Sequence, residues 1–251
     1  FITKKYDIPI ISKDAKEISL VKRDNSWDVF DENDTVIVNA KKLIIANSYE
    51  VQNLKPTSYL SLQKLRGQVT EFCSNQESEK LKCVICGDGY LTPSIKGIHA
   101  CGATYNHNDF SESISEIDHH ANFGKLINTD LKFKNLIHNT DSTDVGGWVG
   151  FRGTTRDYLP FAGPVANFDE MKEKFSYLRL DAKKASDDIG NYFPNLYVNT
   201  GMGSRGLSYA PFCAEIIAAE ISNQIPFIPN QIRLDIHPAR FIIRDLKKKR
   251  I

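Results

Sequence analysis

The sequence predicts a mixed α/β protein of the α+β kind, in which parallel and antiparallel sheets occur in one chain. Three stretches lead to this expectation. Residues 42–48 form a continuous apolar run ending in small residues, which is typical of a strand buried on both faces in a parallel sheet. Residues 195–223 read as a strand, a glycine turn and a helix. Residues 82–105 carry β-type runs separated by glycine and proline, as in an antiparallel hairpin.

The N-terminal region is rich in short strands. Turn-forming residues at 24–25 and 31–34 separate three β-type runs. We expect these strands at Ile18–Val21, Trp27–Phe30 and Val36–Val38. The apolar run at 42–48 then favours a parallel sheet, and a strand in the core of a sandwich remains the alternative.

The middle of the chain predicts a strand at 64–72, the hairpin of 82–92 and 98–105, and a helix over 111–127. Ser115 stands where it could cap that helix, and Ile117, Phe123 and Ile127 give it a partial apolar stripe. A further strand follows at 146–152, then a long ordered loop at 153–164, and one or two helices within 169–192.

The organising stretch of the chain is the glycine loop Gly201-x-Gly203-x-x-Gly206, between a short strand and a helix. Pro211 stands near the start of the expected helix, which we place at 211–221. Its apolar stripe comprises Ala214, Ile217, Ala218 and Ile221.

Such a loop suits an electron-rich or anionic ligand, because glycines let the backbone approach and free amides point outward at a helix start. A dinucleotide motif would continue into a second strand. Here the helix runs into Ile225-Pro-Phe-Ile-Pro229, so the βαβ unit is incomplete. A cofactor contact and a plain tight turn therefore both remain open.

Size and composition give no global case for a nucleic-acid or membrane protein. The 251 residues can form one large domain or two small ones, and the net charge is +1. No apolar run approaches the roughly 18 residues of a membrane span, and no secretion signal is recognisable. Five cysteines, an odd and sparse set, favour reduced thiols and a cytoplasmic location.

No metal site is expected. Cys83-Val-Ile-Cys86 has C-x-x-C spacing, but nothing completes a zinc set and a strand would turn the thiols to opposite faces, so buried strand cysteines are favoured. Asp118-His119-His120 falls in the predicted helix. Adjacent side chains on a helix point about 100° apart, which favours a solvated helical face.

Two basic features leave alternatives open. Arg152 stands at the end of an apolar strand, where its guanidinium either pairs with a structural carboxylate or receives a ligand carboxylate. Lys247–Arg250 is a run of four basic residues in a neutral chain. It is either a solvated terminus or a contact for a phosphate backbone.

Taken in order, several motifs resemble FAD-dependent amine oxidoreductases of the D-amino-acid oxidase and glycine oxidase type. They are Arg66-Gly-Gln, Gly89-Tyr-Leu-Thr-Pro93, Gly102-Ala-Thr-Tyr105, Arg152-x-x-x-Arg156-Asp-x-Leu-Pro160-x-x-Gly163 and Thr200-Gly-Met-Gly-Ser-Arg-Gly-Leu-x-x-Ala-Pro211. The Thr-Arg-Asp-x-Leu-Pro string and the closing Pro-Ala-Arg-Phe-Ile-Ile-Arg narrow the resemblance. They are similar to the oxidoreductase half of bifunctional enzymes that modify tRNA wobble uridines.

The resemblance implies a partial FAD-binding, Rossmann-like domain with an inserted mixed-sheet substrate domain. Residues 1–59 and 153–222 would belong to the FAD-binding domain, 60–152 to the substrate domain, and 223–251 to a basic C-terminal tail. The family's first βαβ unit, which holds the ADP half of FAD, would precede residue 1.

The same resemblance implies the site residues. Arg152 would hold a substrate carboxylate, with Arg205 and Tyr90 lining the pocket. The expected contacts to FAD are Arg66, Gly67, Gln68, Gly201, Gly203, Ser204, Gly206 and Leu207.

The implied reaction is the oxidative removal of the carboxymethyl group from 5-carboxymethylaminomethyl uridine in tRNA, giving 5-aminomethyl uridine and glyoxylate. The implied partners are tRNA and a methyltransferase domain of the same parent chain. Two alternatives remain: an oxidase of free glycine or D-amino acids, and a non-catalytic fragment without FAD.

Overall fold

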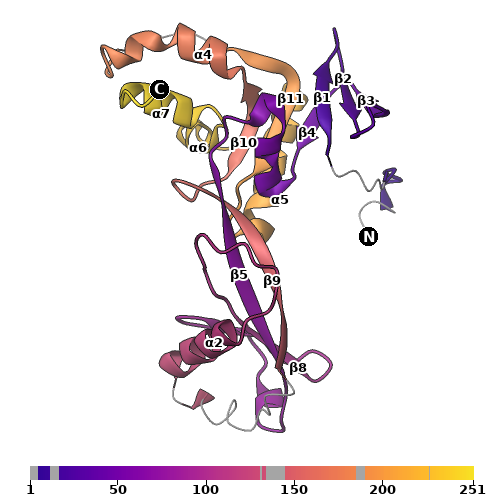
Figure 1. Ribbon diagram of the computed structural model, residues 1–251, viewed down its shortest axis with the longest axis vertical. Coiled ribbons are helices and arrows are strands. Elements are labelled where there is room, and N and C mark those ends of the chain that lie inside the picture. The colour runs from indigo at the N-terminus through magenta and orange to yellow at the C-terminus, as the bar shows by residue number, and fades with distance from the viewer. Residues whose placement is uncertain (1–4, 12–16, 131, 134–144, 185–189, 226) are drawn as a thin grey trace. The chain divides into compact units, whose positions relative to one another are not determined.

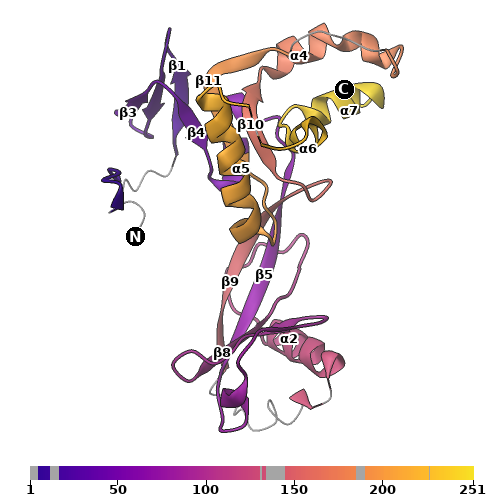
Figure 2. The same cartoon turned by 180° about the vertical axis from the view of Figure 1, so that it is seen from behind.

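The computed structural model describes residues 5–11, 17–130, 132–133, 145–184, 190–225 and 227–251. The chain divides into two compact units, one formed by residues 1–61 and 159–251 and the other by residues 62–158. Figures 1 and 2 show the elements of both units from opposite sides. Among the described residues, the first unit contains two sheets and the second contains one, and each unit buries apolar side chains of its own.

The first unit begins with a three-stranded antiparallel sheet. Its strands, in order, are β1 (Ser19–Lys22), β2 (Trp27–Phe30) and β3 (Val36–Ala40). The predicted short strands are therefore confirmed. Trp27 is buried, and its indole nitrogen donates a hydrogen bond to the carbonyl of Pro194, 2.9 Å away.

A second sheet in the same unit joins distant parts of the chain. Its order is β10 (Phe161–Ala166), β11 (Tyr192–Thr200) and β4 (Leu43–Ile45). β4 pairs with β11 in parallel, which confirms the parallel interpretation of the apolar run. Its expected burial on both faces is wrong, because β4 lies at an edge and Ile44 is 47% exposed.

Helix α5 (Gly206–Ile221) follows β11 and packs on β10 and β11 (Figure 2). It begins five residues before Pro211, which lies inside the helix. The predicted stripe is displaced: Ala214 and Ala218 are exposed, and the buried residues are Cys213, Ile216 and Ile217. The predicted and the observed sets of residues both repeat with the helical period. The observed set packs against the sheet because it includes Ile216, whose side chain is larger than those of Ala214 and Ala218.

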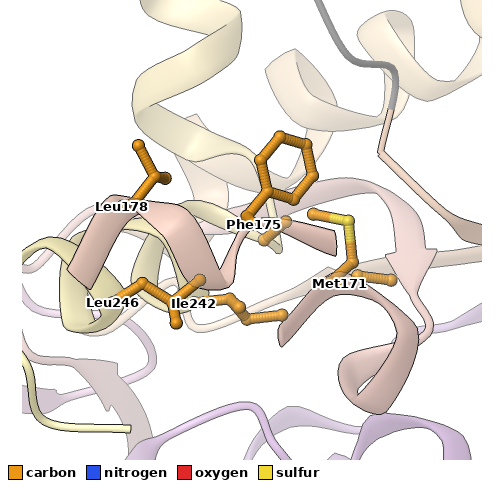
Figure 3. Packing of buried hydrophobic residues seen from close by; sticks show 7 residues of the cluster. Met171, Phe175, Leu178, Ile242 and Leu246 are labelled. Carbon is orange, nitrogen blue, oxygen red and sulfur yellow. The ribbon is translucent and has the colours of Figure 1, made fainter. Parts of the chain in front are cut away.

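Two helices lie within the C-terminal residues that were expected as a basic tail. α6 (Asn230–Ile236) and α7 (Arg240–Lys247) lie near α4 (Phe168–Lys174) and a 3₁₀ turn at Ser176–Arg179. Figure 3 shows Ile242 and Leu246 of α7 against Met171, Phe175 and Leu178. Because the apolar side of α7 is buried in this cluster, the helix that carries the basic side chains has a fixed position in the unit.

The second unit is built on a five-stranded antiparallel sheet. Its order is β6 (Ile85–Cys86), β7 (Tyr90–Leu91), β8 (Ile98–Gly102), β5 (Leu62–Cys73) and β9 (Val145–Thr155). β5 and β9 pair continuously from Leu62↔Thr155 to Phe72↔Val145. Because this pairing runs to Thr155, the loop expected at 153–164 is shorter than predicted.

Helix α2 (Glu116–Thr129) packs on this sheet and corrects one prediction. Asp118 and His119 are buried rather than solvated, and Ile117 is 79% exposed. The buried face of α2 is polar because β5 presents Arg66, Gln68 and Thr70 toward it. A search for apolar periodicity misses such a face.

The cysteines of β6 and its approach also differ from expectation. Cys83 and Cys86 are both exposed, because β6 is a two-residue strand at the edge of the sheet. Within the described ranges, no group of three or more His, Cys, Asp or Glu residues could hold a metal ion. None of the described helices combines the length and the apolar character needed to cross a membrane.

Candidate functional site

Arg152 lies on β9 of the second unit, half-buried, and its guanidinium stacks on an aromatic ring. The guanidinium carbon is 4.7 Å from the centroid of Tyr105, and Nη1 lies 3.5 Å from the carbonyl oxygen of Thr104. Among the described residues Arg152 forms no ion pair with a carboxylate. Of the two alternatives for Arg152, the structural carboxylate is therefore not found in the described part of the chain.

Gly67 makes room for this guanidinium. A Cβ at position 67 would lie 1.9 Å from Nη1 of Arg152 and 2.8 Å from the carbonyl oxygen of Thr104. Only a residue without a side chain is compatible with this position of Arg152. Gly67, expected as a cofactor contact, thus has a steric role within its own unit.

Tyr90 belongs to the same neighbourhood. Burial raises the pKa of its hydroxyl above the usual value, and the nearby positive charge of Arg152 offsets part of that rise. The hydroxyl therefore stays protonated at neutral pH and can donate a hydrogen bond. The structure brings together Arg152, Tyr90 and Gly67 of the predicted set.

Arg66 and Gln68 lie on the opposite face of β5, because neighbouring side chains of a strand alternate. Arg66 is 1% exposed and pairs with Asp118, and it also donates to the carbonyls of Ser111 and Ser113, each at 2.7 Å. The Gln68 amide nitrogen donates to the Ser115 carbonyl at 2.8 Å, and its oxygen accepts the Ser115 amide at 2.7 Å. Their side chains join α2 to the sheet, and their expected FAD contacts stay predictions.

Asp118 is ionised within this network. Burial by itself raises the pKa of its carboxyl, but hydrogen bonds from Arg66 and Asn106 outweigh it and lower the pKa below the usual value. The pair is thus a buried carboxylate and guanidinium that satisfy each other.

The glycine turn lies in the first unit, between β11 and α5. Gly201 has φ of 75° and Gly203 has φ of 55°, a region of backbone conformation that favours glycine. The Thr200 hydroxyl donates to the carbonyl of Ser48 at 2.8 Å, which ties the end of β11 to the segment after β4. The turn therefore stands at the carboxyl ends of two parallel strands, where α/β sheets bind ligands.

Several polar groups at this turn have no partner within the described structure. Among the described residues, no backbone acceptor lies within hydrogen-bond reach of the amides of Gly203, Ser204, Gly206 and Leu207. Leu207 is 99% exposed, and the Arg205 guanidinium donates a hydrogen bond to the hydroxyl of the neighbouring Tyr209, 3.2 Å away. The turn presents donors outward rather than being filled by core side chains.

Two amide oxygens next to the turn are also without partners. Oδ1 of Asn47, after β4, and Oδ1 of Asn199, in β11, are buried and have no hydrogen-bond partner in the part of the chain that the structure describes. Buried polar atoms normally have partners, so a polar ligand at the strand ends would satisfy them.

The two neighbourhoods belong to different units. Arg152, Tyr90 and Gly67 are in one, and Gly201, Gly203, Ser204, Arg205, Gly206 and Leu207 are in the other. The prediction that Arg152 faces the glycine turn across a common pocket stays a prediction. The sequence did not predict a role for Tyr105, whose ring stacks against the Arg152 guanidinium. Its position at the end of the Gly102-Ala-Thr-Tyr105 motif is the signal that could have indicated one.

The family model described as "FAD dependent oxidoreductase" matches residues 11–220. The chain belongs to this family. The family description names FAD. The free amides of the glycine turn and the unpaired oxygens of Asn47 and Asn199 fit a large polar cofactor of this kind.

Two proteins with sequences similar to this chain have the same name. The bifunctional tRNA 5-methylaminomethyl-2-thiouridine biosynthesis protein MnmC of Saccharophagus degradans is 37% identical over 215 residues, covering 86% of this chain and 30% of that protein. The protein of the same name from Legionella pneumophila strain Corby is 32% identical over 234 residues, covering 91% and 34%. The chain thus spans about a third of the length of these relatives.

Solved structures show the same fold at low identity. Glycine oxidase from Geobacillus kaustophilus has a TM-score of 0.64 and 15% identity, covering 89% of this chain and 52% of that one. L-proline dehydrogenase from P. horikoshii also has a TM-score of 0.64, with 14% identity, covering 90% and 54%.

Proposed function

We propose that this chain is the oxidoreductase part of a bifunctional tRNA-modifying enzyme. In this role it oxidises the carboxymethylamino group of 5-carboxymethylaminomethyl uridine at the wobble position. The products are 5-aminomethyl uridine and glyoxylate. The names of the relatives, which describe bifunctional proteins of tRNA 5-methylaminomethyl-2-thiouridine biosynthesis, support a tRNA substrate and a second activity in the parent chain, for which we propose a methyltransferase domain.

The observation that carries the proposal is the guanidinium of Arg152, which is held on Tyr105 and has no carboxylate partner among the described residues. A planar guanidinium matches a carboxylate with two parallel hydrogen bonds. The substrate offers one carboxylate, which is bonded directly to the methylene that is oxidised. Arg152 therefore fixes the position of the reacting carbon.

Tyr90 assists Arg152 as a neutral hydrogen-bond donor. Its hydroxyl stays protonated because burial raises its pKa. A neutral donor beside a guanidinium adds a second contact to a carboxylate without adding charge.

FAD, when bound, would supply the two-electron oxidation in which the methylene loses a hydride and the adjacent nitrogen loses a proton. The amides of Gly203, Ser204, Gly206 and Leu207 would hold the electron-rich part of this cofactor at the start of α5. Water then adds to the oxidised carbon–nitrogen bond, and the bond breaks to give the primary amine and glyoxylate.

The test uses the full-length parent protein and tRNA that carries the modified uridine. Expected products are glyoxylate and a nucleoside lighter by the carboxymethyl group, measured by mass spectrometry. Arg152→Ala should lower kcat/KM roughly 100-fold, since a lost charged hydrogen-bond pair costs about 1.5–3 kcal/mol. Lys82→Ala, which removes an exposed cation of the same unit, is the matched control.

Three results would count against the proposal. Unchanged turnover by Arg152→Ala removes Arg152 from carboxylate binding. Preferential turnover of free glycine over the modified tRNA favours an amino-acid oxidase. A full-length protein that binds no FAD supports a non-catalytic binding module instead.

A further inference from the structure

Three glycines lie on one face of the sheet in the second unit, on neighbouring strands. They are Gly102 in β8, Gly67 in β5 and Gly150 in β9. Gly67 pairs directly with Gly150, and Val69, two residues further along β5, pairs with Gly102. Paired residues of antiparallel strands, and residues two apart on one strand, share a face of the sheet. The three glycines therefore share one face, and Arg66, which pairs with a side chain of α2, points to the other.

Two side chains of β9 extend over the paired glycines. A Cβ added to Gly67 would overlap Nη1 of Arg152, and one added to Gly150 would lie 3.0 Å from Cζ3 of Trp148. The Trp148 ring therefore leans along its strand toward Arg152. Since directly paired residues of antiparallel strands lie about 4.5–5.5 Å apart, the ring edge and the guanidinium are neighbours above one face, roughly 5 Å from each other.

The Trp148 ring is open to solvent. It is 53% exposed, although Val69, with which it pairs across the sheet, is only 2% exposed. Among the described residues, no aromatic ring or cation stacks on Trp148, and its indole nitrogen donates no hydrogen bond. An aromatic side chain buries about 150–250 Å² when it is covered, so an open indole beside a charged group is a large contact surface for a flat ligand.

The groups above this face suit a ligand with two chemically different ends. The guanidinium of Arg152, held against the Tyr105 ring, matches a carboxylate. The Tyr90 hydroxyl lies 3.5 Å from the position of a Cβ on Gly102 and adds a neutral donor. The Trp148 ring matches a planar aromatic group, which stacks on an indole. A carboxylate and a planar ring in one molecule would contact all of these groups.

We propose that Trp148 stacks on the uracil ring of the modified nucleoside whose carboxylate Arg152 binds. Four bonds join the carboxylate carbon to the ring, through two methylenes and one nitrogen. At about 1.5 Å a bond they span at most about 5 Å, which matches the separation of the two side chains. One ligand can therefore bind the guanidinium with its carboxylate while its base lies against the indole. The proposal rests on the proposed function in naming this nucleoside.

This contact distinguishes the modified nucleoside from free glycine. Both ligands have a carboxylate, a methylene and a nitrogen in succession, so Arg152 and Tyr90 contact either one. Only the nucleoside has a base to stack on Trp148, and stacking of a base on an aromatic ring changes affinity roughly 10- to 100-fold on alanine substitution. Trp148 therefore selects for the nucleoside, whereas Arg152 sets where the reacting carbon lies.

The test compares two ligands that share the carboxymethylamino group: 5-carboxymethylaminomethyl uridine, which has a base, and N-ethylglycine, which has none. Binding to the full-length protein is measured by isothermal titration calorimetry without oxygen, with FAD reduced beforehand so that neither ligand is oxidised. Trp148→Ala should lower the ratio of nucleoside affinity to N-ethylglycine affinity roughly 10- to 100-fold. Trp148→Phe, which keeps an aromatic ring, should retain most of that ratio.

The matched control is Phe110→Ala, which should leave the ratio unchanged. Phe110 is another exposed aromatic residue of the second unit, at 62%, and it follows Asp109, which pairs with Arg66. An unchanged ratio in Trp148→Ala, or an equal fall in the control, would overturn the proposal. So would a proportional loss of both affinities in Trp148→Ala, which indicates a merely structural role, or a wild-type protein that does not bind the nucleoside.

A further variant separates this proposal from the proposed function. Arg152→Ala should weaken the binding of both ligands and leave their ratio near the wild-type value. If it weakens neither while Trp148→Ala still lowers the ratio, the carboxylate role of Arg152 fails and the stacking contact stands. A full-length protein that binds the nucleoside through Trp148 but forms no glyoxylate would refute the proposed reaction alone.

Discussion

At the scale of single residues, the Arg152 guanidinium can occupy its position because Gly67 has no side chain. The guanidinium occupies the space where any other residue would place its Cβ. Nη1 is the mobile end of a long side chain, so an alanine at this position would displace Arg152 rather than unfold the strand. The carbonyl oxygen of Thr104, 2.8 Å from the added Cβ, belongs to the backbone, so the chain at Thr104 or at position 67 must also move.

We therefore expect Gly67→Ala to lower kcat/KM for the carboxylate substrate roughly 10- to 100-fold, with a smaller effect on stability, because the guanidinium loses its charged contacts. Steady-state kinetics and thermal unfolding measure the two effects. Gly124→Ala is the control, since a Cβ there meets no atom within 4 Å. Equal kinetics for both variants would refute the steric role of Gly67.

Because of His237, we expect the free energy of unfolding to depend on pH. Its pKa is about 4 in the folded protein, against 6.5 for an unperturbed histidine. Between these values the unfolded chain binds a proton that the folded chain does not. The free energy of unfolding should therefore fall as the pH drops from about 6.5 to about 4, by at most about 3 kcal/mol.

The comparison variant is His237→Asn, which keeps an acceptor for the amide of Ala239 but does not titrate. Urea unfolding at several pH values should show wild type losing stability relative to this variant over that window. Parallel pH profiles for the two proteins would show that His237 is not held neutral.

At the scale of elements, α2 is joined to its sheet by polar contacts more than by an apolar stripe. Arg66, Asp118 and Gln68 are almost fully buried there. Their hydrogen bonds specify one register of the helix on β5, because a shift would leave buried charges without partners.

Removing one member should therefore be costly. Asp118→Asn leaves the buried Arg66 charge with the more exposed Asp109 carboxylate, 3.5 Å away, as its remaining ion-pair partner among the described residues, and we expect a loss of about 3 kcal/mol in the free energy of unfolding. Glu77→Gln breaks the exposed pair with Lys80 and should cost less than about 1 kcal/mol. Chemical denaturation of both variants checks the contrast, and similar losses would contradict it.

The start of α5 offers a test that separates ligand binding from folding. A Cβ at Gly206 would have room in the protein, since the nearest atom, on Met202, is 3.9 Å away. We expect Gly206→Ala to keep or slightly raise the melting temperature, because alanine is the better helix former. It should weaken FAD binding, measured by flavin fluorescence, because the methyl group obstructs a closely approaching ligand. Unaltered affinity would place FAD away from Gly206.

At the scale of the whole molecule, the cysteines report on the two units separately. Burial raises the pKa of Cys101, in the second unit, to about 12 and that of Cys213, in the first, to about 11. Cys73, Cys83 and Cys86 are exposed. Iodoacetamide near pH 8 should label these three in the native protein and leave Cys101 and Cys213 unmodified.

Peptide mapping by mass spectrometry at increasing urea concentrations then follows each unit. Cys101 and Cys213 should become reactive as their own units unfold. Rapid labelling of either in native buffer would contradict the burial of that thiol.

Some of this structure could be read from local sequence. The short strands of residues 17–46, the parallel partner at Leu43–Ile45 and the glycine turn before α5 follow from runs of β-formers, an apolar segment and glycine spacing, all of which act over a few residues. Ordered motifs also indicated the family that matches residues 11–220.

Other features depend on contacts between distant residues. The burial of Asp118 and His119, the stripe of α5 centred on Ile216, and the exposure of Cys83 and Cys86 each depend on which element lies opposite. The space that Gly67 leaves for Arg152 exists only because β5 and β9 pair in one register. Local sequence by itself determined most of the strands and the place of the glycine turn before α5. The strand β10, the helices α6 and α7 and the environment of each side chain depend on neighbours across the fold, so only the tertiary structure decided them.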